Sequence, residues 1–233
     1  MIIYLFMFGL FIVYPIYIFL KEYQYYKKSQ YYNQTKTTFS ILYTDIGKYG
    51  EFNIYKNLEK LSGYKKFLFN TYITKDDGTT SEIDVILIHN SGIYVFESKN
   101  YSGWIFGRES DIKWTQVLQA GAGTKKFKFL NPIIQNKGHI KALSKKINND
   151  EIPIYSYIIF SNRCTLKQIK IDSTDIKVLN RCNTLKSINH NYNIKGNVMK
   201  NVEIDNIYNM LYPYTQVDET VKKLHIKNIK NNY

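Results

Sequence analysis

Two neighbouring β-rich runs limit most strongly what this chain can fold into. The runs SEIDVILIH (81–89) and GIYVFESK (92–99) flank the short turn Asn90-Ser91 and predict a β-hairpin. Both runs are apolar at successive positions, so each strand must be covered on both of its faces. We therefore expect this hairpin in the middle of a sheet that lies between layers of helices.

The segments around the hairpin supply the covering helices and further strands. Residues 48–62 form a predicted helix, because its inward positions recur with helical spacing from Glu51 to Leu58. Glu51 therefore points toward the protein body. The other predicted elements are strands at 65–73, 103–107, 112–118 and 152–160, and helices at 131–148 (opened by Asn131-Pro132), 203–212 and 218–230 (capped by Asp218). The order helix, three strands, helix, strand predicts an α/β sandwich around a mixed sheet.

The far end of the hairpin carries charged residues in a place where charge is costly. Because side chains alternate along a strand, Glu97 and Lys99 share one face. A buried ionised group must be paired or must bind a metal ion. If the turn is symmetric about Asn90-Ser91, Asp84 lies opposite Glu97, and the two carboxylates repel each other. A divalent cation such as Mg²⁺ would turn that repulsion into binding, with Lys99 beside it to orient or deprotonate a bound water and to stabilise charge at phosphorus.

Two alternatives to this interpretation stay open. A three-residue loop with Gly92 in a left-handed conformation would oppose Asp84 to Ser98 and break the site. A plain ion pair between Glu97 and Lys99, beside an exposed Asp84, would account for the same residues without any chemistry.

At these residues the sequence resembles the nuclease-related domain (NERD) family, which is assigned to the PD-(D/E)xK restriction-endonuclease-like superfamily. The resemblance spans about 47–160, roughly half of the chain. It rests on four segments, SEIDVILIHNSGIYVFESKNYSG (81–103), YGEFNIYKNL (49–58), KWTQ (113–116) and NPIIQNKGHIKAL (131–143). It implies a restriction-endonuclease-like αβββαβ core with a mixed sheet.

The resemblance also implies a role for each matching residue. It makes Asp84 and Glu97 ligands of Mg²⁺ or Mn²⁺, Lys99 the catalytic lysine, Glu51 a further acidic residue at the metal, and Gln116 a glutamine beside the site. Ile83 stands where the name of the motif has proline, as in many members of the superfamily. Every ionisable residue of the motif is present, which favours an active enzyme.

The charge of the chain favours a polyanionic partner. The sequence has 32 Lys and Arg against 19 Asp and Glu, a net charge of +13. We expect nucleic acid, with DNA as the substrate, to contact five lysines: Lys125, Lys126 and Lys128, which interleave with Phe127 and Phe129, and Lys141 and Lys145 on the helix at 131–148. A solvated lysine-rich surface would give the same pattern.

Histidine and cysteine give no sign of a metal site in the sequence. Neither cysteine belongs to a CxxC pair, and no His/Cys cluster has zinc spacing. We interpret the histidines as structural or exposed residues; they are His89, His139, His190 and His225.

The N-terminal run 2–20 is uncharged and about long enough to cross a bilayer. A cleaved signal peptide would need a basic start and a small-residue cleavage site, which the run lacks. Basic residues follow the run and only Met1 precedes it, so we expect a single-pass membrane protein with a cytoplasmic catalytic domain. The expected organisation is a transmembrane anchor (1–20), a juxtamembrane spacer (21–46), the nuclease-like core (47–160) and an extension that completes the domain (161–233).

The sequence thus predicts a membrane-anchored, divalent-metal-dependent nuclease. The main alternative is a non-catalytic, membrane-tethered module that binds nucleic acid or directs assembly and keeps the nuclease fold. A peripheral lipid-binding protein would use the positive charge but would leave the acidic cluster unexplained.

Overall fold

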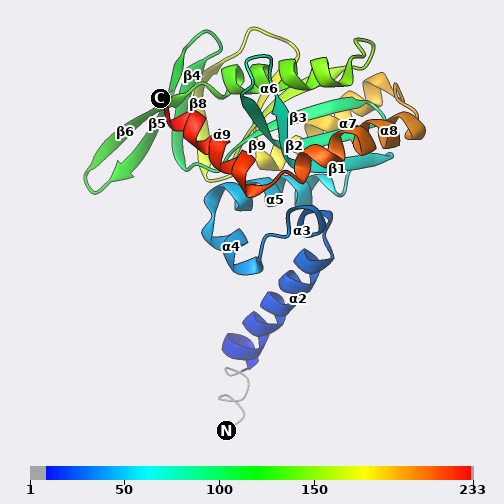
Figure 1. Cartoon of the computed structure of the whole chain (residues 1–233). Helices are drawn as coiled ribbons and strands as arrows, with labels where there is room; N and C mark the ends of the chain where they lie inside the picture. The colour runs from blue at the N-terminus through cyan, green and yellow to red at the C-terminus, as the bar shows by residue number, and fades with distance from the viewer. Residues whose placement is uncertain (1–8, 232–233) are drawn as a thin grey trace.

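Two mixed β-sheets form the centre of the structure, a computed structural model that describes residues 9–231 (Figure 1). The first sheet has the order β1-β2-β3-β7-β9, and the second has the order β6-β5-β4-β8. The strands are β1 (Lys65–Thr74), β2 (Thr80–His89), β3 (Gly92–Lys99), β4 (Gly103–Arg108), β5 (Lys113–Ala120), β6 (Gly123–Leu130), β7 (Ile154–Phe160), β8 (Cys164–Lys170) and β9 (Ile176–Asn180).

Helices cover both faces of the first sheet. The helices of the described residues are α2 (Tyr14–Lys28), α3 (Gln30–Thr35), α4 (Phe39–Thr44), α5 (Ile46–Leu58), α6 (Pro132–Ile147), α7 (Thr184–Lys195), α8 (Asn201–Leu211) and α9 (Glu219–Asn231), with short helical turns at Gly9–Val13, Arg181–Asn183 and Tyr212–Thr215. One core joins α5 and α7 to the sheet, and includes Val85 and Phe96. A second core joins α6 and α8 to the opposite face, and includes Ile86 and Val95.

The β2–β3 hairpin lies inside the first sheet, as its doubly apolar strands predict. β2 pairs with β1 and β3, and β3 pairs with β2 and, in parallel, with β7. His89 lies opposite Gly92 and Val85 opposite Phe96, so the even register about Asn90-Ser91 is confirmed and the three-residue loop is excluded.

The second sheet continues the two innermost strands of the first. Beyond Lys99 the chain of β3 leads into β4, and beyond Phe160 the chain of β7 leads into β8, and β4 and β8 again pair in parallel. The β5–β6 hairpin is added at the β4 edge and extends outward from the body (Figure 1). The sequence predicted one mixed sheet, whereas the structure contains two mixed sheets.

Beyond residue 47, three strands and one helix were missing from the sequence-based assignment. β6 was interpreted as a basic and aromatic segment, and β8, β9 and α7 were not assigned. Most of β6 and much of β8 are exposed, so these strands lack the apolar alternation that marks a half-buried strand. Their positions depend on pairing with distant strands, which local composition does not encode.

The expectation of a membrane-spanning N-terminal helix is wrong. Within residues 9–231, no helix combines the length and the apolar character that crossing a membrane requires. The predicted single-pass membrane topology with a cytoplasmic domain depended on this helix and is therefore also unsupported. Residues 2–8 of the run 2–20 lie outside the described residues.

The physical reason lies in where the helix of this region runs. After a π-helical turn at Gly9–Val13, α2 continues to Lys28 and includes the charged segment that follows the apolar run. In that segment Glu22 forms an ion pair with Lys56 of α5 at 2.5 Å. Tyr26 is fully buried. The apolar residues 14–20 therefore belong to a helix whose second half packs on the folded domain.

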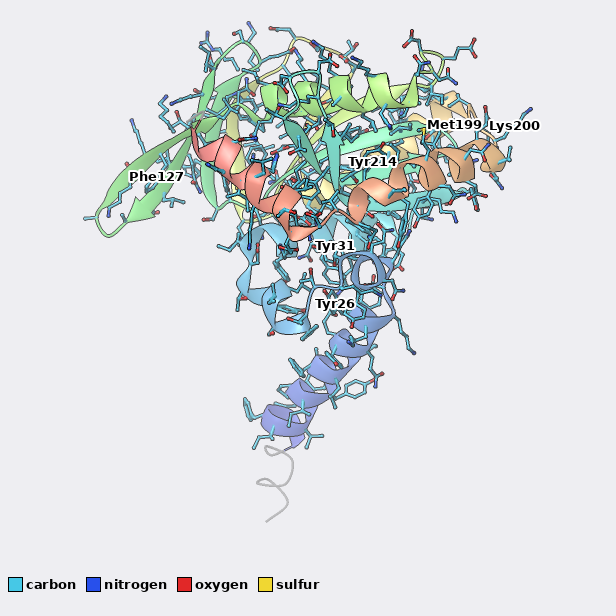
Figure 2. The ribbon with its side chains drawn as sticks, in the orientation of Figure 1. Tyr26, Tyr31, Phe127, Met199, Lys200 and Tyr214 are labelled. Atoms are coloured by element: carbon cyan, nitrogen blue, oxygen red, sulfur yellow. The ribbon has the colours of Figure 1, made fainter. Side chains whose placement is uncertain are left out.

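Residues 21–46, expected as a spacer, form the end of α2 and the helices α3 and α4. Tyr26 and Tyr31 are fully buried among the aromatic rings that join these helices to α5, and Figure 2 shows both at the junction between α2 and the body. Tyr26 donates a hydrogen bond to the carbonyl of Thr37 at 2.7 Å.

Asn131 connects α6 to the turn between β4 and β5. Its Oδ1 caps the helix by accepting the amide of Ile133 at 2.9 Å, and its Nδ2 donates to the carbonyls of Glu109 and Asp111 at 3.0 and 2.7 Å. The side chain is fully buried. We predict that Asn131→Ala lowers the free energy of unfolding by about 2–4 kcal/mol, because a cap is lost and buried carbonyls lose their donor.

Urea unfolding at pH 7 measures this change. Asn193→Ala, at an exposed position of α7, serves as the matched control and should stay within about 0.5 kcal/mol of the wild-type chain. An Asn131→Ala variant as stable as this control would contradict the prediction.

Candidate active site

Asp84 of β2 lies next to Glu97 and Lys99, near the C-terminal end of β3. Lys99 Nζ lies 2.6 Å from Glu97 Oε1 in an ion pair whose side chains are 15% and 4% exposed. Asp84 Oδ2 accepts the backbone amide of Ser98, between these two residues, at 2.8 Å. The structure therefore brings together the three residues that define the sequence motif.

A local distortion of β2 turns Asp84 toward β3. Ile83 packs in the core on the α6 side, whereas Val85 packs in the core on the α5 side. Residues two apart on a regular strand share a face, so the strand is twisted at Asp84. On β1 the position between the partners of Ile83 and Val85 is Asn70, which has a positive φ of 49°. Asp84 therefore leaves the regular ladder and reaches the amide of Ser98.

The electrostatic balance differs between the two carboxylates. Burial, followed by the negative charges of Glu97 and Glu51, raises the pKa of Asp84 well above its usual range. Burial also acts on Glu97, but the charge of Lys99 and the hydrogen bond from His139 outweigh it and lower the pKa of Glu97 to about 2. Burial alone would lower the pKa of Lys99, but Glu97 and Asp84 raise it, so Lys99 stays charged.

Glu51 approaches this cluster from α5. The preceding residue, Gly50, lets the helix come close to β3, since a Cβ there would lie 2.7 Å from Ser98 Oγ. Glu51 is 8% exposed and accepts a hydrogen bond from the hydroxyl of Tyr31 at 2.9 Å. Burial raises its pKa to about 7, against the opposing effect of that hydrogen bond. The inward direction predicted from helical spacing is confirmed.

His139 is a residue of the site that the sequence analysis missed. Its Nε2 lies 3.0 Å from Glu97 Oε2, and its Nδ1 lies 2.6 Å from Ser81 Oγ. The sequence analysis, which interpreted His139 as structural or exposed, did not anticipate its contact with Glu97, because the two residues are far apart in sequence. One signal was available: Asn136 and His139 lie three residues apart within the apolar stripe of α6, and Asn136 is also buried against the sheet.

A comparison with known protein families finds a match over the segment that contains this site. The sequence model of the family described as "Nuclease-related domain" matches residues 46–161, from the first residue of α5 to just beyond β7. The chain belongs to the nuclease-related domain (NERD) family. It is 33% identical over 188 residues to an uncharacterized protein of Bacillus anthracis, covering 80% of this chain and 85% of that protein. No solved structure matches the chain.

The remaining expected residues of this NERD protein lie on three other elements. Gln116 is on β5 and donates from Nε2 to the carbonyl of Ser102 at 2.8 Å, so it holds the connection that leaves the site. Lys125, Lys126 and Lys128 lie on the exposed strand β6. Lys141 and Lys145 lie on α6, where both line a cavity of about 490 Å³ and Lys145 pairs with Asp76.

The carboxylates of the Asp84–Glu97 pair are compatible with a divalent cation that takes most of its ligands from water and phosphate. Among the described residues, no group of three or more His, Cys, Asp or Glu side chains is arranged to hold a metal ion. Mg²⁺ commonly takes one or two carboxylates and fills its remaining positions with water and phosphate oxygens. Asp84 fits this use, because the carboxylate is crowded by negative charge and its one recorded hydrogen bond is to the amide of Ser98. Glu51, which accepts a hydrogen bond from Tyr31, contributes a further negative charge that acts on Asp84.

The raised pKa of Glu51 gives a pH-dependent stability difference. Between an ordinary value near 4.5 and the folded value of about 7, the folded state keeps a proton that the unfolded state releases, so Glu51 destabilises the fold increasingly as the pH rises. We predict that Glu51→Gln, whose amide oxygen can still accept from Tyr31, is more stable than the wild type at pH 8. The expected gain is on the order of a few kcal/mol, falling toward zero near pH 4.5.

Thermal or urea unfolding of both chains between pH 4.5 and 8.5 measures this difference. The control, Glu151→Gln, changes an exposed carboxylate and should differ from the wild type by less than about 0.5 kcal/mol throughout. A stability gap between Glu51→Gln and the wild type that does not grow with pH would refute the assigned pKa.

Proposed function

We propose that this NERD protein hydrolyses phosphodiester bonds of nucleic acid, with DNA as the substrate and Mg²⁺ or Mn²⁺ as the cofactor. The observation that carries the proposal is the meeting of Asp84, Glu97 and Lys99 near the end of the covered strand β3, with the lysine charged, Glu97 buried and Asp84 half-buried. Membership of the nuclease-related domain family supports the same reaction.

Asp84 and Glu97 are the residues that would hold the cation. A divalent cation bound there would polarise the phosphate and activate a water molecule for attack. Glu97 is kept ionised and fixed in direction by Lys99 on one oxygen and His139 on the other. Ser81 in turn fixes the ring of His139.

Lys99 serves this reaction as a fixed positive charge. Its pKa is raised, so it does not act as a base in the cation-free protein. A charged lysine stabilises negative charge and does not deprotonate water. A buried ammonium group next to the reacting phosphate stabilises the negative charge that develops on its oxygens. Lysines on β6 and α6 would then hold the nucleic acid backbone by charge alone, as the net charge of +13 favours.

Nicking of supercoiled plasmid by the purified full-length chain tests the proposal. We predict cleavage with Mg²⁺ or Mn²⁺ that stops when a chelator is added. Asp84→Asn, Glu97→Gln and Lys99→Met should each lower the rate by at least about 100-fold, because each removes a charge at the reacting phosphate. The matched controls change the same residue types at exposed positions; they are Asp150→Asn, Glu151→Gln and Lys60→Met.

Two results would refute the enzymatic proposal. One is cleavage by Glu97→Gln at the wild-type rate, which would assign the activity to another site or to a contaminant. The other is a wild-type chain that binds nucleic acid but never cleaves it with either cation. That outcome would establish the competing function, a binding module that keeps the nuclease fold.

A further inference from the structure

The second sheet has one covered face and one exposed face. Ile105 of β4 and Trp114 of β5 are buried in the core beneath it. The alternate positions face away from that core, and Trp104 of β4 is 44% exposed. We call this surface the open face. Its members on the four strands are Lys126 and Lys128 of β6, Lys113, Thr115 and Val117 of β5, Trp104, Phe106 and Arg108 of β4, and Thr165, Lys167, Gln168 and Lys170 of β8. Most of these side chains are exposed, Thr115 and Phe106 are half-buried, and Val117 is buried.

The register of the strands arranges these residues in rows across the sheet. In one row Lys126 lies beside Val117, Val117 beside Trp104, and Trp104 beside Thr165. In the next row Lys128 lies beside Thr115, which lies beside Phe106. Because adjacent strands are about 4.8 Å apart, the four strands make a surface about 14 Å wide. Aromatic rings stand on the central strand β4, and lysines stand on the strands at both edges.

The charge of the open face is of one sign. The four strands contain seven basic residues and no Asp or Glu; the basic residues are Arg108, Lys113, Lys125, Lys126, Lys128, Lys167 and Lys170. Most of these side chains are exposed, as Figure 2 illustrates for the outer hairpin, where Phe127 is labelled. Lys167 Nζ lies 5.3 Å from the centre of the Trp104 ring, a cation–π contact. A partner must therefore offer negative charge at the edges and flat apolar groups at the centre.

We propose that the open face binds single-stranded nucleic acid, with an unpaired base stacked on Trp104 and phosphates held by Lys126, Lys128 and Lys167. Unpaired bases stack on exposed aromatic side chains, whereas the bases of a duplex cover one another and present only their edges. When a base occupies the Trp104 ring, the ammonium of Lys167 is displaced toward the neighbouring phosphate. This binding site is distinct from the residues proposed to act in cleavage.

The position of the open face also connects it to the candidate active site. β4 begins four positions after Lys99, and Gln116 of β5 holds the connecting segment through the carbonyl of Ser102. Trp104 is five positions after Lys99 along the chain, so their Cα atoms lie within about 18 Å. A strand bound on the open face therefore lies within a few nucleotides of Asp84 and Glu97.

Tryptophan fluorescence tests this proposal directly, because the chain has only two tryptophans and Trp114 is 1% exposed. We predict that a short oligo-dT quenches the emission of the full-length chain in the presence of chelator. Trp104→Phe should still bind the oligonucleotide but lose the quenching. Trp104→Ala should weaken binding by roughly 5- to 100-fold, as expected for loss of one stacked base.

The lysines are tested by the salt dependence of binding. The triple variant Lys126→Gln/Lys128→Gln/Lys167→Gln should reduce the slope of log K against log salt by about 2, as three lost contacts to a single strand require. The control triple, Lys60→Gln/Lys186→Gln/Lys195→Gln, removes the same charge at exposed positions elsewhere and should leave the slope nearly unchanged.

Four results would overturn the proposal: unchanged binding by Trp104→Ala, quenching that persists in Trp104→Phe, tighter binding of a duplex of equal length, or displacement of the oligonucleotide by polyglutamate at equal charge. The last result would indicate an acidic protein as the partner. Because binding is measured with chelator present, loss of the open face and loss of nuclease activity are separate outcomes.

Discussion

A buried ion pair at the end of a covered strand organises the part of the molecule that matters for function. Glu97 and Lys99 lie 2.6 Å apart where β3 leaves the first sheet, and both are largely removed from water. Such a pair adds little net stability, because desolvation cancels most of the attraction, but removing one partner would leave an unpaired buried charge. Asp84 from β2, Glu51 from α5 and His139 from α6 all approach this pair, so both helical layers contribute to it.

Charge balance at the pair explains why a cation would be accommodated there. The negative charges of Glu97 and Glu51 both act on Asp84, whereas the positive charge of Lys99 acts mainly on Glu97. The pKa values of Asp84 and Glu51 are both raised, in each case chiefly by burial, so ionising both carboxyls without a counter-charge is costly. A divalent cation at Asp84 and Glu97 would lower the energy of the ionised cluster, and phosphate oxygens would complete its ligands.

The sequence predicted those features that depend on local periodicity. The alternation of side chains along β3 predicted that Glu97 and Lys99 share a face, and the symmetric turn predicted the register of β2 against β3. Helical spacing predicted that Glu51 points inward. Features that depend on distant segments were missed, such as the His139–Glu97 contact and the second sheet. The N-terminal helix was misjudged because counting apolar residues ignored its continuation into a segment in which Tyr26 is buried in the domain.

Anomalous scattering from crystals of the full-length chain soaked in Mn²⁺ tests the central claim most directly. The account predicts a peak within coordination distance of one oxygen of Asp84 and one of Glu97, and loss of that peak in Asp84→Asn. A chain that cleaves nucleic acid at the same Mn²⁺ concentration, but has its anomalous peak elsewhere or has none at this pair, would contradict the account.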